Sequence, residues 1–106
     1  MKNQKEILQI IKVIAEGYDP EKIILFGSYA TGKARDDSDL DLFIIKKTKE
    51  PYLQRSRIVR RLFRPYPCAM DIFVYTPEEY DKSNTIPGFL PYIVIKEGVT
   101  LYERIS

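Results

Sequence analysis

Apolar residues recur along this chain with two different periods, and the changes of period predict alternating helices and strands. Residues 4–16 place apolar side chains at helical spacing, whereas 22–26 and 40–46 are short, almost continuous apolar runs. The elements expected in the first half are a helix over 4–16 that ends at Gly17, a strand over 22–26, a short helix from Ser28, a polar loop over 32–38 and a strand over 40–46. Those expected in the second half are a helix from Pro51 to about Phe63, a strand over 70–75, a short helix opened by a capping box at Thr76–Glu79, a loop over 84–88 and a final strand over 99–103.

One segment, 89–97, fits both periods. Its centre, Tyr92–Ile95, favours a strand, whereas the spacing of Leu90, Ile93 and Val94 before Gly98 favours a helix. The order of elements predicts an α/β (α+β) fold, with a small mixed or antiparallel β-sheet and helices packed on one side. A chain of 106 residues suffices for one core, so a single domain over 1–106 is expected.

Composition limits the expected cellular compartment and excludes some kinds of catalysis and metal binding. No apolar stretch approaches the roughly 20 residues that cross a bilayer, and charged residues interrupt the N-terminal helix, so neither a membrane partner nor a secretion signal is expected. The one cysteine, Cys68, excludes an internal disulfide and fits a reducing, cytoplasmic location. The chain has no histidine, which rules out His-based acid–base catalysis and His-ligated zinc, and its net charge of +2 argues against nucleic-acid affinity from bulk charge.

Two pairs of polar residues stand at the ends of predicted strands. Gly27 and Ser28 follow the apolar run 23–26, where a glycine lets backbone approach a ligand and a serine can cap a short helix whose N–H groups favour phosphate. Asp39 and Asp41 open the next apolar run, and alternation along a strand directs both carboxylates to the same side. Paired carboxylates suit Mg²⁺, which completes its coordination with water and substrate phosphates. The pattern therefore indicates a site for a magnesium–nucleoside triphosphate, the alternative being an ordinary turn and solvated aspartates.

The segment 27–45, GSYATGKARDDSDLDLFII, resembles the GS-x10-DxD signature of the DNA polymerase β-type nucleotidyltransferases. The length of the chain is similar to that of the free-standing minimal nucleotidyltransferases of this superfamily. The resemblance implies a nucleotidyltransferase-like fold and tips segment 89–97 toward a helix. It also implies a third acidic residue on a neighbouring strand, which Asp71 in MDIFVY matches.

The resemblance assigns roles to these residues. Asp39, Asp41 and Asp71 are expected to be the catalytic and metal-binding residues, with two Mg²⁺ ions and ATP as substrate. Gly27 and Ser28 are expected to bind the β- and γ-phosphates. The superfamily often has arginine where this chain has Thr31, so Lys33 or Arg35 is expected to supply the positive charge.

Minimal nucleotidyltransferases commonly accompany a HEPN-domain protein, typically an RNase toxin, and act as its antitoxin. The resemblance therefore implies transfer of AMP from ATP to a tyrosine hydroxyl of such a toxin. Two alternatives stay open. One is nucleotidyl transfer to a small molecule or an RNA end, and the other is a non-catalytic module that neutralises its partner by binding alone.

A second charged feature lies on the expected helix after Pro51. Five arginines occur within ten residues, Arg55, Arg57, Arg60, Arg61 and Arg64, and helical spacing places the last four on one broad face. One interpretation is a solvated outer face. The other is a docking stripe for an acidic partner or an RNA acceptor, since arginine pairs well with carboxylate and phosphate.

Overall fold

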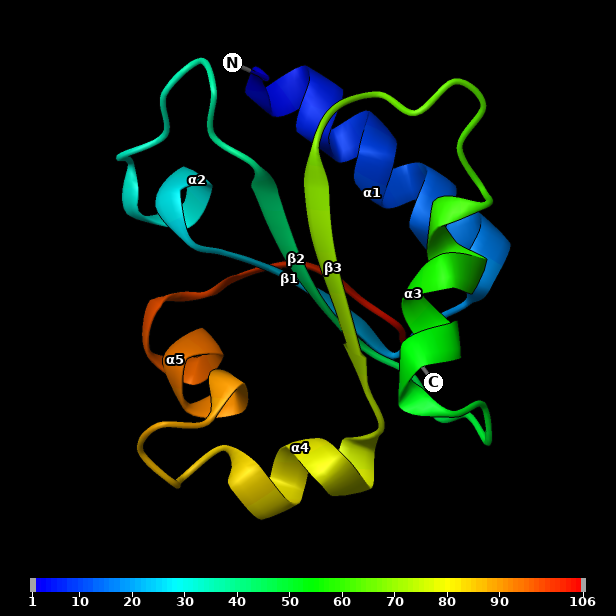
Figure 1. Cartoon of the computed structure of the whole chain (residues 1–106), viewed down its shortest axis with the longest axis vertical. Helices are drawn as coiled ribbons and strands as arrows, with labels where there is room; N and C mark the ends of the chain where they lie inside the picture. The colour runs from blue at the N-terminus through cyan, green and yellow to red at the C-terminus, as the bar shows by residue number, and fades with distance from the viewer. Residues whose placement is uncertain (1, 106) are drawn as a thin grey trace.

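The computed structural model describes residues 2–105, and within them helices and strands follow the order that the apolar pattern predicts, with two helices in succession before the last strand (Figure 1). The expected domain of 1–106 includes two terminal residues that lie outside this described part. The helices are α1 Gln4–Tyr18, α2 Ser28–Thr31, α3 Tyr52–Arg60, α4 Pro77–Ser83 and α5 Leu90–Glu97. The strands are β1 Lys22–Phe26, β2 Leu40–Ile45, β3 Met70–Tyr75 and β4 Val99–Glu103.

The four strands form one sheet in the order β3-β2-β1-β4. β1 is antiparallel to both β2 and β4, whereas β2 and β3 run parallel because α3 carries the chain back between them. The sheet is therefore mixed, which confirms the expected fold class. The parallel pair also brings the amino ends of β2 and β3 to the same edge of the molecule, in the upper half of Figure 1.

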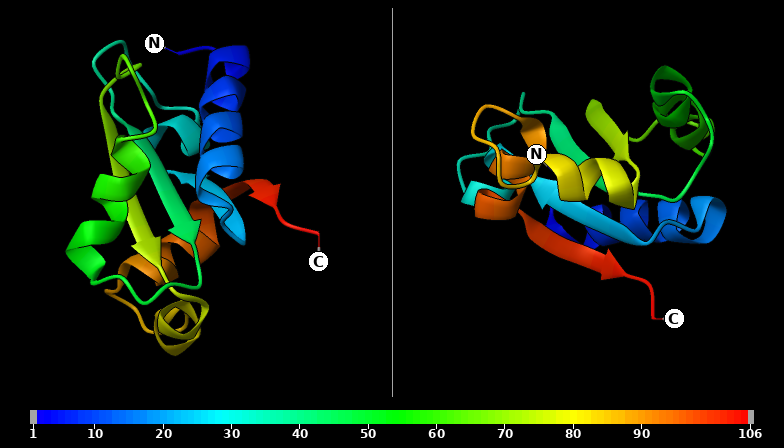
Figure 2. Two further views of the ribbon diagram at one scale, coloured as in Figure 1. Left: turned by 90° about the vertical axis from the view of Figure 1, so that its right-hand side faces the viewer. Right: turned by 90° about the horizontal axis from the view of Figure 1, so that it is seen from below.

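Helices cover both faces of the sheet, so the expectation of helices on one side was wrong in this detail. Buried side chains of α1 and α3 pack against one face, and Val94 of α5, with partly buried Tyr80 of α4, packs against the other. Figures 1 and 2 show α1 and α3 on one side of the strands and α5 on the opposite side. The physical reason is visible in β1 and β2, which are apolar at almost every position and must bury both faces.

Two helix ends differ from the sequence expectation. Gly17 lies inside α1, which ends at Asp19 in a left-handed conformation with φ of 51°. A Cβ atom at Gly17 would lie 2.9 Å from a methyl carbon of Leu62, so a larger residue there would require the Leu62 side chain to shift. α3 ends at Arg60 rather than near Phe63.

The second half of the chain follows its local signals closely. The capping box of α4 is present, with the Thr76 hydroxyl accepting from the Glu79 N–H at 3.1 Å and the Glu79 carboxylate accepting from the Thr76 N–H at 2.8 Å. The ambiguous segment 89–97 forms helix α5, whose Val94 is buried in the core. None of the helices within residues 2–105 has the length and apolar character required to cross a bilayer.

Candidate active site

Asp41 and Asp71 lie side by side at the amino ends of the two parallel strands. The register of β2 and β3 pairs Asp41 directly with Asp71, although thirty residues separate them in sequence. Asp41 is half-buried and Asp71 is exposed on the edge strand, while Asp39 is exposed immediately before β2 begins. The structure thus brings together the three carboxylates that the sequence singled out, at one edge of the sheet.

Asp41 carries the strongest electrostatic perturbation of this group. Burial, as the largest cause, together with the neighbouring carboxylates of Asp71, Asp39 and Glu97, raises the pKa of Asp41 from 3.8 to about 6. Hydrogen bonding between the Asp41 and Asp71 side chains contributes as well. A carboxylate in this surrounding is electrostatically unfavourable until a cation or a proton compensates it.

Gly27 forms the opposite wall of this site, and it has no room for a side chain. Its φ of 73° and ψ of −155° are accessible to glycine and strained for other residues. A Cβ atom at Gly27 would overlap the Asp41 carboxylate oxygen. The glycine therefore lets the turn after β1 pass directly against the carboxylate of β2.

Ser28 differs slightly from its expected position. It is the first residue of α2, and Gly27 occupies the capping position before it, with no side-chain cap. The Ser28 hydroxyl therefore makes no capping hydrogen bond, and the residue is partly exposed beside Gly27.

Glu97 is a member of this cluster that the sequence did not reveal. Its carboxylate oxygen Oε1 accepts a hydrogen bond from the Gly27 N–H at 3.1 Å, across seventy residues of sequence. Glu97 also raises the pKa of Asp41. Its only sequence signal is a glutamate at the end of a segment whose structure was ambiguous. We refer to Asp39, Asp41, Asp71 and Glu97 as the carboxylate cluster.

Lys33 and Arg35 lie in the loop between α2 and β2, close in sequence to the cluster but with exposed side chains. The Lys33 N–H donates to the Ser28 carbonyl at 2.9 Å and the Arg35 N–H donates to the Ser38 hydroxyl at 2.8 Å. These bonds hold the backbone of the loop. Both side chains point from an exposed loop, so the expected phosphate-binding role of Lys33 or Arg35 stays a prediction.

The donor chemistry of the cluster fits Mg²⁺ completed by a substrate. Across residues 2–105, no three Asp, Glu, Cys or His side chains converge tightly enough to form a ready-made metal cage. Mg²⁺ does not require such a cage, because it usually takes one or two carboxylates and fills its other positions with water and phosphate oxygens. Asp41 with its destabilised charge, flanked by Asp39 and Asp71, supplies ligands of this kind.

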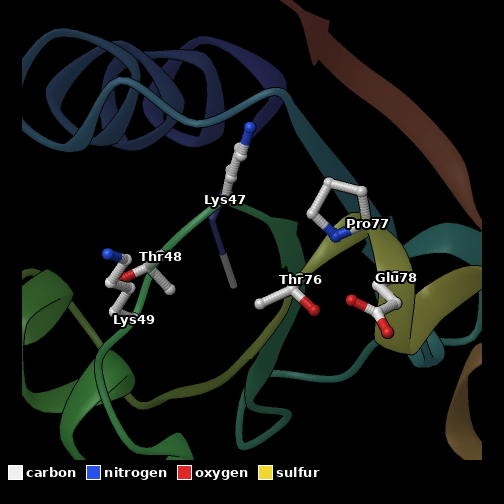
Figure 3. Close-up of a pocket in the computed structure, with 6 residues that line it drawn as sticks. All are labelled: Lys47, Thr48, Lys49, Thr76, Pro77 and Glu78. Atoms are coloured by element: carbon white, nitrogen blue, oxygen red, sulfur yellow. The ribbon is translucent and has the colours of Figure 1, made fainter.

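A pocket of about 640 Å³ lies at the other end of the sheet and is not part of this site. It is lined by the segment after β2, Lys47–Lys49, and by the start of α4, Thr76–Glu78 (Figure 3). Both segments follow the carboxyl ends of β2 and β3, whereas Asp41 and Asp71 lie at their amino ends. The pocket is therefore separated from the carboxylate cluster by the length of the strands.

Arg55 differs from the four arginines that follow it, because it is buried and cannot belong to an exposed docking surface. Its side chain is buried and pairs with both Glu79 oxygens, at 2.7 and 3.2 Å, while also donating to the carbonyl groups of Glu50 and Val74. Hydrogen bonding to Arg55 lowers the pKa of Glu79. Arg55 thus joins α3 to β3 and to the start of α4, which is a structural role.

The other four arginines remain exposed, and we call them the arginine surface: Arg57, Arg60, Arg61 and Arg64. α3 ends at Arg60, so the last two lie beyond the helix rather than on it. Arg60 donates to the carbonyl of Met70 at 3.4 Å, next to Asp71. The arginine surface therefore reaches the end of β3 that carries the carboxylate cluster.

The chain belongs to the polymerase beta nucleotidyltransferase family, whose model matches residues 8–105. This confirms the resemblance seen in the sequence and the prediction of a nucleotidyltransferase enzyme.

Two relatives of known sequence match most of the chain. One is "Putative protein adenylyltransferase MJ0604" of Methanocaldococcus jannaschii, 29% identical over 96% of this chain and 100% of the relative. Another is "Putative protein adenylyltransferase MJ0141" of the same organism, 31% identical over 74% of this chain and 83% of the relative.

Solved structures share the fold. A crystal structure described as "a putative nucleotidyltransferase from Sulfolobus solfataricus" has a TM-score of 0.63 and 24% identity, covering 92% of this chain and 78% of that one. A crystal structure described as a toxin-antitoxin with AMP-PNP has a TM-score of 0.66 and 22% identity, covering 91% of this chain and 72% of that one. At these identities the likeness establishes the fold alone.

Proposed function

We propose that this protein is a magnesium-dependent adenylyltransferase that transfers AMP from ATP to a hydroxyl group of a partner protein. The observation that carries the proposal is the pairing of Asp41 with Asp71 beside a glycine turn that fits directly against Asp41. The two M. jannaschii relatives, whose names specify protein adenylyltransferases, support a protein as the acceptor.

Each residue has a distinct task in this proposal. Asp39, Asp41 and Asp71 would hold the magnesium, with two ions in the full complement. Bound Mg²⁺ would neutralise the clustered carboxylates and stabilise charge on the transferring phosphoryl group. The Gly27–Ser28 turn holds the β- and γ-phosphates, with the Ser28 hydroxyl as a donor, and Lys33 or Arg35 adds positive charge from the adjoining loop.

Asp71 occupies the position best suited to the acceptor. It is exposed on the edge strand, whereas Asp41 is half-buried beside Gly27, so the nucleotide and the acceptor approach from different sides. Asp71 orients the acceptor hydroxyl, whose oxygen attacks the α-phosphorus in line while the bond to the bridging oxygen breaks and pyrophosphate leaves. The hydroxyl proton passes to solvent at this exposed carboxylate.

The partner completes the proposal. Similar folds occur in toxin-antitoxin structures, including one that contains AMP-PNP and one of the MntA-HpeT pair. We propose that this chain is likewise an antitoxin, that its acceptor is a toxin of the HEPN class, and that a tyrosine hydroxyl receives the AMP. Modification of the toxin would then silence it in the cytoplasm.

The test is transfer of label from α-labelled ATP. The purified protein is incubated with Mg²⁺, labelled ATP and the product of any adjacent gene that encodes a HEPN protein, or with a lysate of the source organism. Asp39→Asn is run alongside, and Asp81→Asn, on the exposed side of α4, serves as the variant with the same change of charge.

We expect label on one small protein with the wild type and Asp81→Asn, and none with Asp39→Asn. Label on RNA or on a small solute would replace the acceptor while keeping nucleotidyl transfer. Neutralisation of the toxin without any label, and equally by Asp39→Asn, would favour the non-catalytic binding module.

A further inference from the structure

The carboxylate of Glu97 makes a contact that the proposed transfer reaction does not use. Glu97 is the last residue of α5, on the face of the sheet opposite α1 and α3. Its oxygen Oε1 accepts from the Gly27 N–H at 3.1 Å, and the residue is only partly exposed. Hydrogen bonds to a charged acceptor are stronger than neutral ones, and partial burial increases the difference.

This bond acts on the one residue of the turn whose conformation is most restricted. Gly27 adopts φ of 73° and ψ of −155° and leaves no space between its Cα atom and the Asp41 carboxylate. Its carbonyl already accepts from the N–H groups of Ala30 and Thr31, at 3.0 and 3.1 Å. Those bonds fix Gly27 to α2, whereas the bond to Glu97 fixes it to a different element.

The end of α5 is itself held close to the sheet. A Cβ atom at Gly98 would lie 2.6 Å from a methyl carbon of Ile24 and would overlap the Val94 carbonyl oxygen. The absence of a side chain at Gly98 therefore lets the helix end lie directly on β1. Val94, one turn earlier, is buried in the core on this face. The Glu97 side chain thus extends from backbone that is packed against the sheet.

A fourth carboxylate in this position has an electrostatic cost. Glu97 adds to the negative charge around Asp41, as Asp71 and Asp39 do. A glutamine could accept the same hydrogen bond without that charge. An oxygen acceptor at position 97 and the negative charge it carries can therefore be separated by substitution.

We propose that Glu97 is a positioning residue of the nucleotide site, holding the Gly27 amide so that the Gly27–Ser28 turn is fixed for the triphosphate. This inference rests on the proposed function only for the identity of the nucleotide, because the contact between Glu97 and Gly27 is observed in the structure. Glu97 belongs to neither the signature segment 27–45 nor the paired strands β2 and β3.

Two variants separate the hydrogen bond from the charge. Glu97→Gln keeps an oxygen acceptor and removes the charge, whereas Glu97→Ala removes both. Glu16→Ala, an exposed glutamate of α1, is the control for loss of a surface carboxylate. Two measurements are made on each protein: the Kd for AMP-PNP with Mg²⁺ by calorimetry, and the exchange rate of the Gly27 amide hydrogen by NMR.

We expect Glu97→Ala to weaken AMP-PNP binding about tenfold, the loss associated with one hydrogen bond to a charged group, and to lose protection at the Gly27 amide. Glu97→Gln should bind at least as tightly as the wild type and keep that protection, because the acceptor remains and a charge near the triphosphate is gone. Glu16→Ala should match the wild type in both.

Tighter or unchanged binding by Glu97→Ala would overturn the inference, since the carboxylate would then compete with phosphate or have no part in binding. A Gly27 amide that stays protected in Glu97→Ala would overturn it as well. Failure of the proposed function looks different: the wild type itself would not bind AMP-PNP, while the exchange rates would still report on the contact.

Discussion

The Asp41 carboxylate is proposed to bind metal, yet its negative charge destabilises the folded protein when no metal is bound. Burial and three neighbouring carboxylates raise its pKa from 3.8 to about 6. Because the folded-state pKa exceeds the unfolded one, the folded state binds a proton more tightly, and this contribution to stability is complete below about pH 4. It is lost as the pH rises through about 6, so at neutral pH the metal-free protein is destabilised by the Asp41 charge.

Asp41→Asn should therefore raise the free energy of unfolding of the metal-free protein at pH 7.5 while abolishing nucleotidyl transfer. We expect a gain of about 1 kcal/mol, less than the full shift would give because Asp41 is partly exposed to solvent. Urea denaturation of both proteins at pH 4 and pH 7.5 measures the difference, which should disappear at pH 4. Asp81→Asn has the same change of charge and should leave stability similar at both values; a gain in that variant would assign the effect to net charge.

Alanine substitutions at Gly27 and Gly32 distinguish two effects of an added methyl group, which are backbone strain and collision with a neighbouring side chain. Both have positive φ, 73° and 77°, so alanine is strained at either position, but only Gly27 has a neighbour that a Cβ atom would strike. Gly32→Ala should lose about 1 kcal/mol of stability and keep its affinity for Mg²⁺ and AMP-PNP. Gly27→Ala should lose more and bind the nucleotide at least tenfold more weakly, because Asp41 must move. Equal affinity of the two variants in calorimetry would show that the close approach to Asp41 is unimportant.

At the scale of elements, the fold depends on a cation that joins three of them. Arg55 of α3 contacts the carbonyl of Val74 in β3 and the Glu79 carboxylate, which also completes the cap of α4. Removing one partner of a buried ion pair leaves polar groups without compensation. The same helix carries Arg57, which is exposed and makes a matched comparison.

Arg55→Ala should lower the free energy of unfolding by about 2 kcal/mol, since its guanidinium is buried while Glu79 keeps some contact with water. Arg57→Ala should change it by less than about 0.5 kcal/mol. Denaturation in urea at pH 7.5 compares the two. Similar losses for both variants would mean that the helix propensity of α3, rather than the ion pair, determines the result.

For the whole molecule, the position of the arginine surface relative to the carboxylate cluster suggests how an acceptor approaches. Arg60 bonds to the carbonyl of Met70, the residue before Asp71, and the other members of the arginine surface are exposed on and after the same helix. A basic surface beside an acidic site would attract an acceptor whose own surface is acidic near the modified hydroxyl.

The double variant Arg57→Ser, Arg61→Ser should raise the KM for the acceptor about fivefold, weaken its dependence on salt concentration and leave the Kd for AMP-PNP unchanged. Lys5→Ser, Lys12→Ser on α1 removes the same number of exposed cations elsewhere and should leave the KM unchanged. Equal effects of the two pairs would indicate bulk charge, and no effect of either would leave the arginine surface a solvated face.

The sequence by itself determined the order and most of the limits of the elements. It also placed Gly27, Ser28, Asp39 and Asp41 at strand ends, because those signals are local: an apolar run, a capping box, a glycine beside a strand. Only the tertiary structure decided which residues meet. The parallel pairing of β2 and β3 put Asp71 beside Asp41, as the family resemblance implied, whereas nothing in the sequence indicated that α5 brings Glu97 to Gly27 or that burial gives Arg55 a structural role. Such contacts join residues tens of positions apart and produce no periodic pattern in the sequence. The packing of the sheet and its two helical layers determines them.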